Sequence, residues 1–354
     1  MKENVLIIGA GLTGLLLAHR LKKQGVPVIV LEARDRIGGR IYTHLSAQET
    51  PIEMGATWLG RQHTALVSLL QELDISIYPQ YTEGSAWYEP APMQAPQEVL
   101  LPPNESPSYR IQGGSSVLTH TLGKALGTDV ILLDTIVTSI KATDKAIEVH
   151  TKDKVYTASK VVSTLPPNLL TTSIQFSPTL PEDITAIAKK THTWMGESIK
   201  FGISYASPFW KEHHWSGTLF SNIGPITEMY DHTTLESGKY ALKGFLNSNL
   251  SIVTKEIRQE KVFAQLKRTF GEKALEYIAY EETVWQEQTF SYAPYENYVL
   301  PHQNNGQACY QETHYDNRFY IAGSETASYY GGYMEGAVQS AQQCYEHILK
   351  NISY

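Results

Sequence analysis

Three glycines near the start of the chain have the spacing that lets a backbone turn wrap around a phosphate. Gly9, Gly11 and Gly14 form a G-x-G-x-x-G pattern directly after "VLII" and before a stretch with helical character. The first glycine permits a tight turn, the second lets backbone approach a pyrophosphate, and the third lets the helix pack on the strand. Glu32 ends the next apolar stretch, where an acid can accept a hydrogen bond from a ribose hydroxyl. The pattern predicts a dinucleotide site on a β–α–β unit.

A single lysine stands in a stretch of otherwise small residues. Residues 198–205 alternate between apolar side chains and small or polar ones, which is the period of a strand with one buried face. The second face consists of Ser198, Lys200, Gly202 and Ser204. On this stretch alone, a solvated outer face is the simpler interpretation. A strand that lies close to a flat cofactor is the alternative.

The residues after Glu32 separate two kinds of dinucleotide. The segment "ARDRIGGR" contains Gly38, Gly39 and Arg40. A nicotinamide dinucleotide has no general need for a second glycine pair with further arginines at this place. A flavin dinucleotide does, because the glycines let the chain pass close to the ring system while Arg40 faces phosphate or ring. The segment favours FAD over NAD, and a plain NAD dehydrogenase is the disfavoured alternative.

The segment "VLEARDRIGGRIYT" resembles the flavin-containing amine oxidase family, which includes monoamine, polyamine and L-amino-acid oxidases. The segments "MGATWLG", "STLPP" and "RFYIAGSETASYYGGYMEGAVQSA" are similar to further segments of that family. The resemblance is weak over residues 86–107 and 221–282. It implies bound FAD and the following cofactor-binding residues: Gly9, Gly11, Gly14, Glu32, Ala33, Arg34, Gly38, Gly39, Arg40, Gly55, Ala56, Thr57, Trp58, Val137, Gly323, Ser324, Glu325, Gly332, Tyr333 and Met334.

The C-terminal motif also makes physical sense by itself. Glu325 follows a strand and precedes a helix, which suits it to hydrogen bonds on the ribityl or phosphate side of a flavin. The helix that starts near Tyr333 would direct its positive end at the flavin pyrimidine. Because reduced flavin carries negative charge there, this dipole would favour reduction by about 1 kcal/mol.

The resemblance also implies three catalytic residues. Lys200 matches the lysine that holds a water near flavin N5, and a cation there also assists reoxidation by oxygen. Tyr333 and Tyr295 match two tyrosines whose rings flank the amine in monoamine oxidases. Tyr295 is found by counting from Trp285, so the neighbouring Tyr292 and Tyr298 are the alternatives. Trp194 is a further residue that could line the cavity.

Two departures from the family pattern are informative. Pro294 stands where monoamine oxidases have the cysteine that bonds the flavin, so we predict non-covalent FAD. Trp58 stands where L-amino-acid oxidases have an arginine for the substrate carboxylate, which disfavours α-amino acids. Polyamine oxidases would need acids in the cavity; Glu53 and Glu197 are the acids present, and a surface or hydrogen-bonded scaffold position is the simpler interpretation of both.

Composition limits the class of protein and its partners. The 354 residues carry a net charge of −7 with no block of basic residues, so nucleic acid is not an expected partner. Two cysteines exclude a disulfide framework and fit a reducing cytoplasm. Glycine and threonine interrupt the first apolar run, so we expect no membrane span. The expected partners are a small-molecule amine and O₂, with a homodimer left open.

We therefore predict an α/β chain with a two-domain FAD-binding fold, of the Rossmann-type βαβ and glutathione-reductase-like kind, and a mixed-sheet substrate domain. Residues 1–80, 109–175 and 286–354 would form the FAD domain, and residues 81–108 and 176–285 the substrate domain. The segment 181–194 reads as one helix, and the proline-rich segment 81–109 as a long loop or an excursion into the other domain.

The predicted activity is oxidation of a primary or secondary amine. Hydride passes to flavin N5, the imine is hydrolysed to an aldehyde, and O₂ becomes H₂O₂. Three alternatives stay open at this point: an FAD oxidase of a specialised pathway substrate, a desaturase, and a flavin-bound protein without amine turnover.

Overall fold

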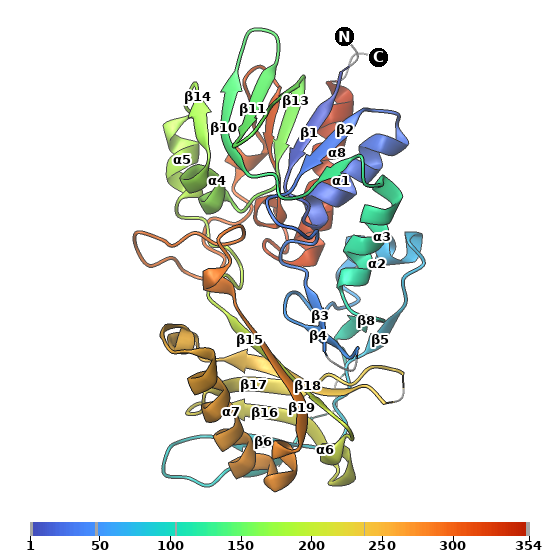
Figure 1. Ribbon diagram of the computed structural model, residues 1–354, viewed down its shortest axis with the longest axis vertical. Coiled ribbons are helices and arrows are strands. Elements are labelled where there is room, and N and C mark those ends of the chain that lie inside the picture. Colours follow the sequence, from blue (N-terminus) through green and yellow to red (C-terminus); the bar gives the residue numbers. More distant parts are fainter. Residues whose placement is uncertain (1–2, 47–48, 103–104, 237, 352–354) are drawn as a thin grey trace.

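The computed structural model describes residues 3–46, 49–102, 105–236 and 238–351 (Figure 1). Two bodies make up the chain. In Figure 1 the upper body holds a largely parallel sheet with helices, and the lower body holds a seven-stranded sheet. This α/β arrangement confirms the predicted two-domain fold class. The residue ranges assigned to the two domains remain a prediction.

The upper body is built on a six-stranded sheet in the order β20-β21-β13-β1-β2-β9. β1 pairs in parallel with β2 and with β13, as a β–α–β unit requires. Helices α1, α3 and α8 pack together through a buried aliphatic core that includes Leu15, Leu122 and Val338. The bounds are β1 Val5–Ile8, α1 Leu12–Lys23, β2 Val28–Leu31, α3 Ser116–Leu126, β9 Ile131–Leu132, β13 Lys160–Ser163, β20 Thr313–His314, β21 Phe319–Ile321 and α8 Met334–Lys350.

A four-stranded sheet, β12-β11-β10-β14, covers the other side of this sheet. Ile140 and Val149 from the small sheet share a core with Leu6 and Phe319 from the large one. The bounds are β10 Val137–Ala142, β11 Ile147–Thr151, β12 Val155–Ala158, α4 Pro167–Ser173, β14 Gln175–Ser177 and α5 Glu182–Ala188.

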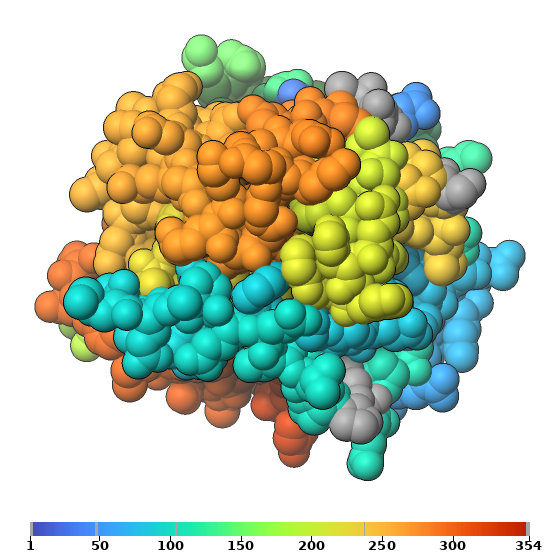
Figure 2. Space-filling view, turned by 90° about the horizontal axis from the view of Figure 1, so that it is seen from below, coloured from blue at the N-terminus to red at the C-terminus, as the bar shows by residue number. Residues whose placement is uncertain are grey.

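The lower body is the seven-stranded sheet β19-β15-β18-β17-β16-β6-β7. Helix α7 covers one face, where Phe201 and Leu242 pack with Leu266. The bounds are β6 Ser85–Glu89, β7 Gln97–Leu100, β15 Ile199–Tyr205, α6 Phe209–Glu212, β16 Trp215–Ser221, β17 Ile226–Asp231, β18 Tyr240–Leu246, α7 Lys255–Phe270 and β19 Tyr277–Val284. Figure 2, seen from below, shows the cyan segment that contains β6 and β7 lying beside orange α7 and yellow-green α6.

The remaining elements are short. They are β3 Thr43–Leu45, β4 Pro51–Glu53, α2 Thr64–Glu72, β5 Ile77–Pro79, β8 Tyr109–Ile111 and the 3₁₀ turns η1 Ser248–Ile252, η2 Glu272–Leu275, η3 Trp285–Glu287, η4 Ala308–Gln311 and η5 Ser324–Thr326. Several pack within one body: α2 and η5 contact α8, and η2 contacts α7. β3 pairs with β4, and β5 with β8.

Two sequence expectations about elements have clear outcomes. The proline-rich segment is an excursion, because β6 and β7 form the edge of the lower sheet. The single helix predicted over 181–194 is wrong at its end. Helix α5 stops at Ala188, and His192 N–H then donates to the Gln303 carbonyl in another loop. In the part of the chain that the structure describes, no helix has the length and apolar character needed to cross a membrane.

Candidate cofactor and active site

A cavity of about 260 Å³ begins at the carboxyl ends of β1 and β2 and reaches the start of α8. Parallel strands expose their carboxyl ends at one edge, which is where such folds bind ligands. Most predicted cofactor residues line this cavity, and they come from segments far apart in the sequence: Gly9, Gly11, Glu32, Ala33, Arg34, Gly38, Gly39, Arg40, Ala56, Val137, Ser324, Gly332, Tyr333 and Met334. The structure therefore brings the N-terminal glycine motif and the C-terminal motif to one site.

The remaining predicted cofactor residues do not line this cavity. They are Gly14, Gly55, Thr57, Trp58, Gly323 and Glu325. A Cβ on Gly14 would stand 2.0 Å from the Gly9 carbonyl oxygen, so this glycine is needed for close packing of α1 on β1. The cofactor role of these six residues stays a prediction.

The lining residues suit a phosphate-containing cofactor. A Cβ on Gly11 would meet nothing within 4 Å, so the helix start leaves room for a ligand against the backbone. Arg34 is half-buried, and its guanidinium donates to Ser291 Oγ and the Phe290 carbonyl, with no carboxylate paired to it among the described residues. Burial, and then the charge of Arg36, lower the pKa of Arg34 to about 10. A bound anion would stabilise the charged guanidinium and so offset both the burial and the repulsion from Arg36.

Glu32 stands at the carboxyl end of β2, as predicted, and is buried. Its Oε2 accepts the Ala10 N–H at 2.7 Å and its Oε1 accepts the Arg34 N–H at 3.0 Å. These bonds fix the carboxylate at the cavity wall. Each oxygen keeps a further lone pair, which a ribose hydroxyl could use.

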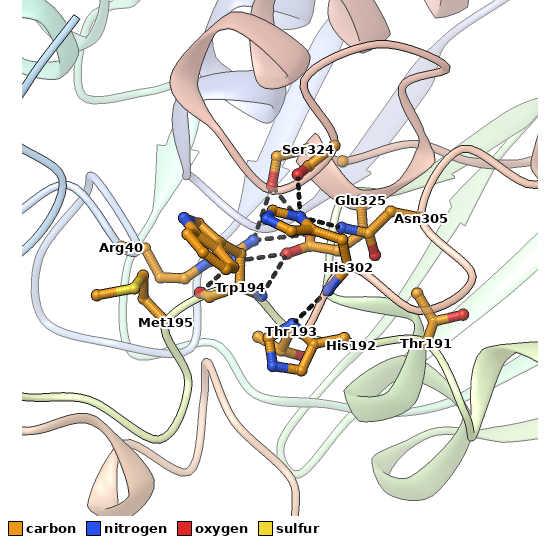
Figure 3. A network of polar contacts seen from close by, with 12 residues as sticks. Arg40, Thr191, His192, Thr193, Trp194, Met195, His302, Asn305, Ser324 and Glu325 are labelled. Carbon is orange, nitrogen blue, oxygen red and sulfur yellow. Dashed lines mark hydrogen bonds and ion pairs between the residues drawn. The ribbon is translucent and has the colours of Figure 1, made fainter. Parts of the chain in front are cut away.

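Arg40 and Glu325 form a buried two-pronged ion pair, with contacts of 2.5 and 2.8 Å (Figure 3). The Glu325 carboxylate also accepts the Ser324 hydroxyl and the Trp194 N–H. We expected this carboxylate to hydrogen bond the cofactor, but its oxygens are occupied by protein donors. Glu325 therefore orients Arg40, which lines the cavity and also donates to the Trp194 carbonyl.

Lys200 is buried, which excludes the solvated-face interpretation. Its Nζ donates to the Gly55 carbonyl oxygen at 2.5 Å, next to Ala56 in the cavity wall. Burial lowers the pKa of Lys200 to about 8. Part of the strand face that carries Lys200 is covered by protein. A Cβ on Gly202 would stand 2.2 Å from Ile52 of β4, so β4 occupies this part of the face. Gly202 lets β4 pack on β15.

Tyr333 is an aromatic residue of the cavity lining and lies at the N-terminal end of α8. Its ring stacks with His302 at 5.5 Å and an interplanar angle of 11°, and lies 5.4 Å from Trp194. Trp194 itself stacks on His302 at 4.0 Å. Figure 3 shows Trp194 and His302 side by side. These three rings form a continuous aromatic cluster at the edge of the cofactor cavity.

The structure does not pair Tyr295 with Tyr333. The Tyr295 hydroxyl accepts the Thr193 N–H at 2.7 Å, and its ring stacks on His192 at 6.4 Å. It lines a different cavity, between α4, α5 and the 294–303 loop. Of the two alternatives, Tyr292 packs on Gly196 and Tyr298 is largely exposed. The ring that accompanies Tyr333 is Trp194.

Sequence reasoning missed three groups of residues at this site. Residues 289–291 line the cavity beside Arg34, and nothing in their composition marks them. His302 joins the aromatic cluster from a loop whose position depends on tertiary packing. Lys243 is a second fully buried lysine beside Lys200, and the signal for it was available: an isolated lysine in the apolar stretch 240–246.

Comparisons with known proteins bear on the family and the fold. The sequence profile of the family described as "Flavin containing amine oxidoreductase" matches residues 12–90 and 92–349. "Amine oxidase [flavin-containing] B" of Sus scrofa and of Homo sapiens are each 25% identical over 455 aligned positions, covering 98% of this chain and 86% of the relative. Among solved structures, putrescine oxidase bound to putrescine superposes with a TM-score of 0.85 at 22% identity, and cyclohexylamine oxidase from Brevibacterium oxydans with 0.87 at 21%. Both superpositions cover 99% of each chain.

Proposed function

The chain belongs to the family of flavin-containing amine oxidoreductases, and we propose that it is an FAD-dependent oxidase of a primary or secondary amine. The observation that carries this proposal is the position of Lys200. Its buried ammonium group is bonded to the Gly55 carbonyl, one residue from the cavity wall at Ala56. The resemblance stated above assigns a lysine in this place to the reacting edge of the flavin.

The residues that would hold FAD lie along the cavity. Gly9, Gly11 and the start of α1 would face the pyrophosphate, and Arg34 would supply a positive charge. Glu32 would accept a hydrogen bond from a hydroxyl of the adenosine ribose. Met334 and Tyr333, at the N-terminal end of α8, would lie at the flavin end. When bound, FAD would supply the acceptor for a hydride from the amine α-carbon and the means to reduce O₂ to H₂O₂, and water would hydrolyse the imine to an aldehyde.

The protein's own side chains prepare the substrate. An amine must be neutral to react, and aromatic walls without charge favour the neutral form. Tyr333 and Trp194 provide such walls beside the cavity. We assign Tyr333 to amine binding, and we assign Tyr295 a positioning role, because its hydroxyl holds the Thr193 N–H. Lys200 would hold a water or anion beside the reacting edge.

We propose that the flavin is bound without a covalent link to cysteine and that the protein resides in the cytoplasm. Pro294 lines the second cavity, and neither Cys309 nor Cys344 lines the cofactor cavity. Precipitation with acid should therefore release the flavin into the supernatant. Yellow colour that stays with the pellet would contradict this.

Support for an amine substrate comes from the family and from what the structural neighbours are named for. Putrescine oxidase and cyclohexylamine oxidase are both named for amines. The test is a peroxide-release assay with the purified protein, added FAD, and a panel of monoamines, diamines, cyclic amines and amino acids. Peroxide formed with one class of amine supports the proposal. A flavin-loaded protein that releases none with any of them contradicts it.

A further inference from the structure

His302 is a titratable side chain inside the aromatic cluster at the edge of the cofactor cavity. Its ring stacks on Trp194 at 4.0 Å and on Tyr333 at 5.5 Å, with interplanar angles of 24° and 11°. Tyr333 and the neighbouring Gly332 line the cofactor cavity, and Gln303, next along the chain from His302, lines the second cavity. A phenyl ring would stack equally well, so the imidazole brings nitrogen atoms that the stacking does not use.

The contacts of the His302 ring decide which nitrogen carries the hydrogen. Nδ1 lies 3.1 Å from the Gly331 carbonyl oxygen, which can only accept a hydrogen bond. Nδ1 is therefore the donor, and the neutral ring keeps its lone pair on Nε2. The Asn305 amide lies beside the same Nδ1, with Nδ2 at 3.4 Å (Figure 3). Turned over, this amide offers the N–H a second acceptor in Oδ1, which otherwise has no partner among the described residues.

Nε2 of His302 has no hydrogen-bond partner in the part of the chain that the structure describes. The side chain is half-buried, and Nε2 is not sealed from solvent, unlike the unpartnered Nε2 atoms of His19 and His314. An accessible lone pair on imidazole can accept a hydrogen bond or a proton from an ammonium group. This nitrogen is therefore a free acceptor on a ring that packs against Tyr333, the residue that we assign to amine binding.

The charged groups around the His302 ring leave it neutral near pH 7. Burial lowers its pKa, although its bond to a carbonyl raises it; His192 lowers the pKa as well and Glu325 raises it. Both neighbouring acids have partners of their own, because Glu325 pairs with Arg40 and Glu197 Oε2 lies 3.4 Å from His192 Nε2. The His302 backbone N–H donates to His192 Nδ1 at 3.2 Å, so His192 holds the loop in place.

An amine substrate arrives with a proton that has to leave. Alkylamines resemble the lysine side chain and are ammonium ions at neutral pH, with a pKa of about 10. The nitrogen of an ammonium ion has no lone pair, so it cannot assist the loss of hydride from the adjacent carbon. Oxidation at neutral pH therefore benefits from a group that first removes one proton from the bound ammonium ion.

We propose that His302 is this general base: its Nε2 accepts one proton from the substrate ammonium group bound beside Tyr333. The N–H bond breaks, its electron pair stays on the substrate nitrogen, and the ring becomes an imidazolium ion that passes the proton to water at its accessible edge. The neutral amine is then ready to lose hydride from its α-carbon. This inference rests on the proposed function and deepens it.

The test is the pH dependence of anaerobic flavin reduction, using the amine of the panel that reduces the FAD-loaded enzyme best. The quantity measured is the limiting reduction rate divided by the dissociation constant of the amine. If His302 takes the proton, the reactive pair is an ammonium ion with a neutral imidazole. The wild-type ratio should then stay level from about pH 6.5 to about pH 10 and fall outside that range. Without a base, the ratio should rise about tenfold per pH unit up to about pH 10.

The matched variants are His302→Asn and His63→Gln. His302 has a left-handed backbone conformation, with φ of 59°, which Asn tolerates, and the Asn amide can still donate to the Gly331 carbonyl. H302N should lose the level range: its ratio should fall at least tenfold at pH 7.5 and come within threefold of wild type near pH 10. H63Q removes another imidazole that packs near Tyr333, at 6.3 Å, and should keep the wild-type profile.

The outcomes separate the inference from the proposed function. A wild-type ratio that rises steadily to pH 10 would overturn the inference without any variant, so the test does not depend on the folding of H302N. A level range that begins near pH 8 would assign the proton to Lys200, whose pKa burial lowers to about 8, and would also overturn it. So would an H302N profile like that of wild type. No reduction by any amine at any pH would overturn the proposed function, and the inference with it.

Discussion

Arg40 and Glu325 lie 285 positions apart in the sequence and form a buried ion pair with contacts of 2.5 and 2.8 Å. The pair joins the turn after β2 to the segment before α8 and to the backbone of Trp194. Arg40 lines the cofactor cavity and Glu325 does not. We propose that the carboxylate would act on a bound cofactor through the arginine that it orients.

Replacing Glu325 with Gln should therefore affect both stability and flavin binding. Removing one partner of a buried pair leaves an uncompensated charge and costs about 3 kcal/mol of unfolding free energy. The matched control is Glu282→Gln, which breaks the buried Arg258–Glu282 pair of the lower body. We expect both variants to lose stability in urea titrations and E325Q alone to weaken FAD binding. Equal FAD affinity in the two variants would contradict this account.

The same pair makes the stability of the fold depend on pH in the acid range. Burial alone would raise the pKa of Glu325, but Arg40 holds that pKa below its ordinary value. A carboxyl group with a lowered pKa stabilises the fold above its unfolded pKa, and that contribution is lost as pH falls through the folded value. The stability difference between wild type and E325Q should therefore shrink below about pH 4.5.

Gly11→Ala and Gly14→Ala should separate cofactor binding from folding. A Cβ at Gly11 meets open space, whereas a Cβ at Gly14 stands 2.0 Å from a backbone oxygen. We expect G11A to leave the apoprotein's thermal midpoint nearly unchanged and to raise the FAD dissociation constant tenfold or more. G14A should unfold at lower temperature with or without FAD. A G11A protein that binds FAD normally would contradict the placement of the cofactor.

Lys200→Met should slow reoxidation by O₂ far more than reduction by the amine. Because burial lowers the pKa of Lys200 to about 8, its charge is present below that pH and lost above it. Reoxidation of the wild type should slow above about pH 8, and K200M should lack that dependence in stopped-flow measurements. The variant should also be more stable near neutral pH, since it removes a buried cation. Unchanged rates in both half-reactions would contradict this role.

Tyr333 and Tyr295 should respond differently to substitution. Tyr333→Ala removes a ring from the cavity wall and should lower the efficiency of flavin reduction at least tenfold. Tyr295→Phe removes the acceptor of the Thr193 N–H and should cost about 1 kcal/mol of stability, with little change in amine KM. The reverse pattern would return Tyr295 to the amine site, opposite Tyr333.

The sequence predicted well where the chemistry is local. The glycine spacing, Glu32 and the C-terminal motif act through backbone that is contiguous in the chain, and they meet at one cavity. The alternation over 198–205 predicted strand β15. It left two interpretations of Lys200, a solvated outer face and a position close to a cofactor, and the burial of Lys200 excludes the first.

The parts that the sequence could not supply concern residues whose neighbours come from distant segments. The local pattern does not reveal that the Tyr295 hydroxyl accepts the Thr193 N–H or that Trp194 packs on Tyr333. It likewise does not reveal that Arg40 is the partner of Glu325. The roles assigned to Tyr295 and Glu325 at the cofactor stay predictions. Lys243 depends on the strand order of the lower sheet, which the weakly matching segment 221–282 did not reveal.

The most direct test of an amine oxidase with flavin in this cavity is the visible spectrum of the FAD-loaded protein, recorded anaerobically while amines are added. We predict that the flavin band bleaches with one class of amine and returns when air is admitted. A band that no amine bleaches, or a protein that shows no flavin band even after FAD is added, would contradict the account.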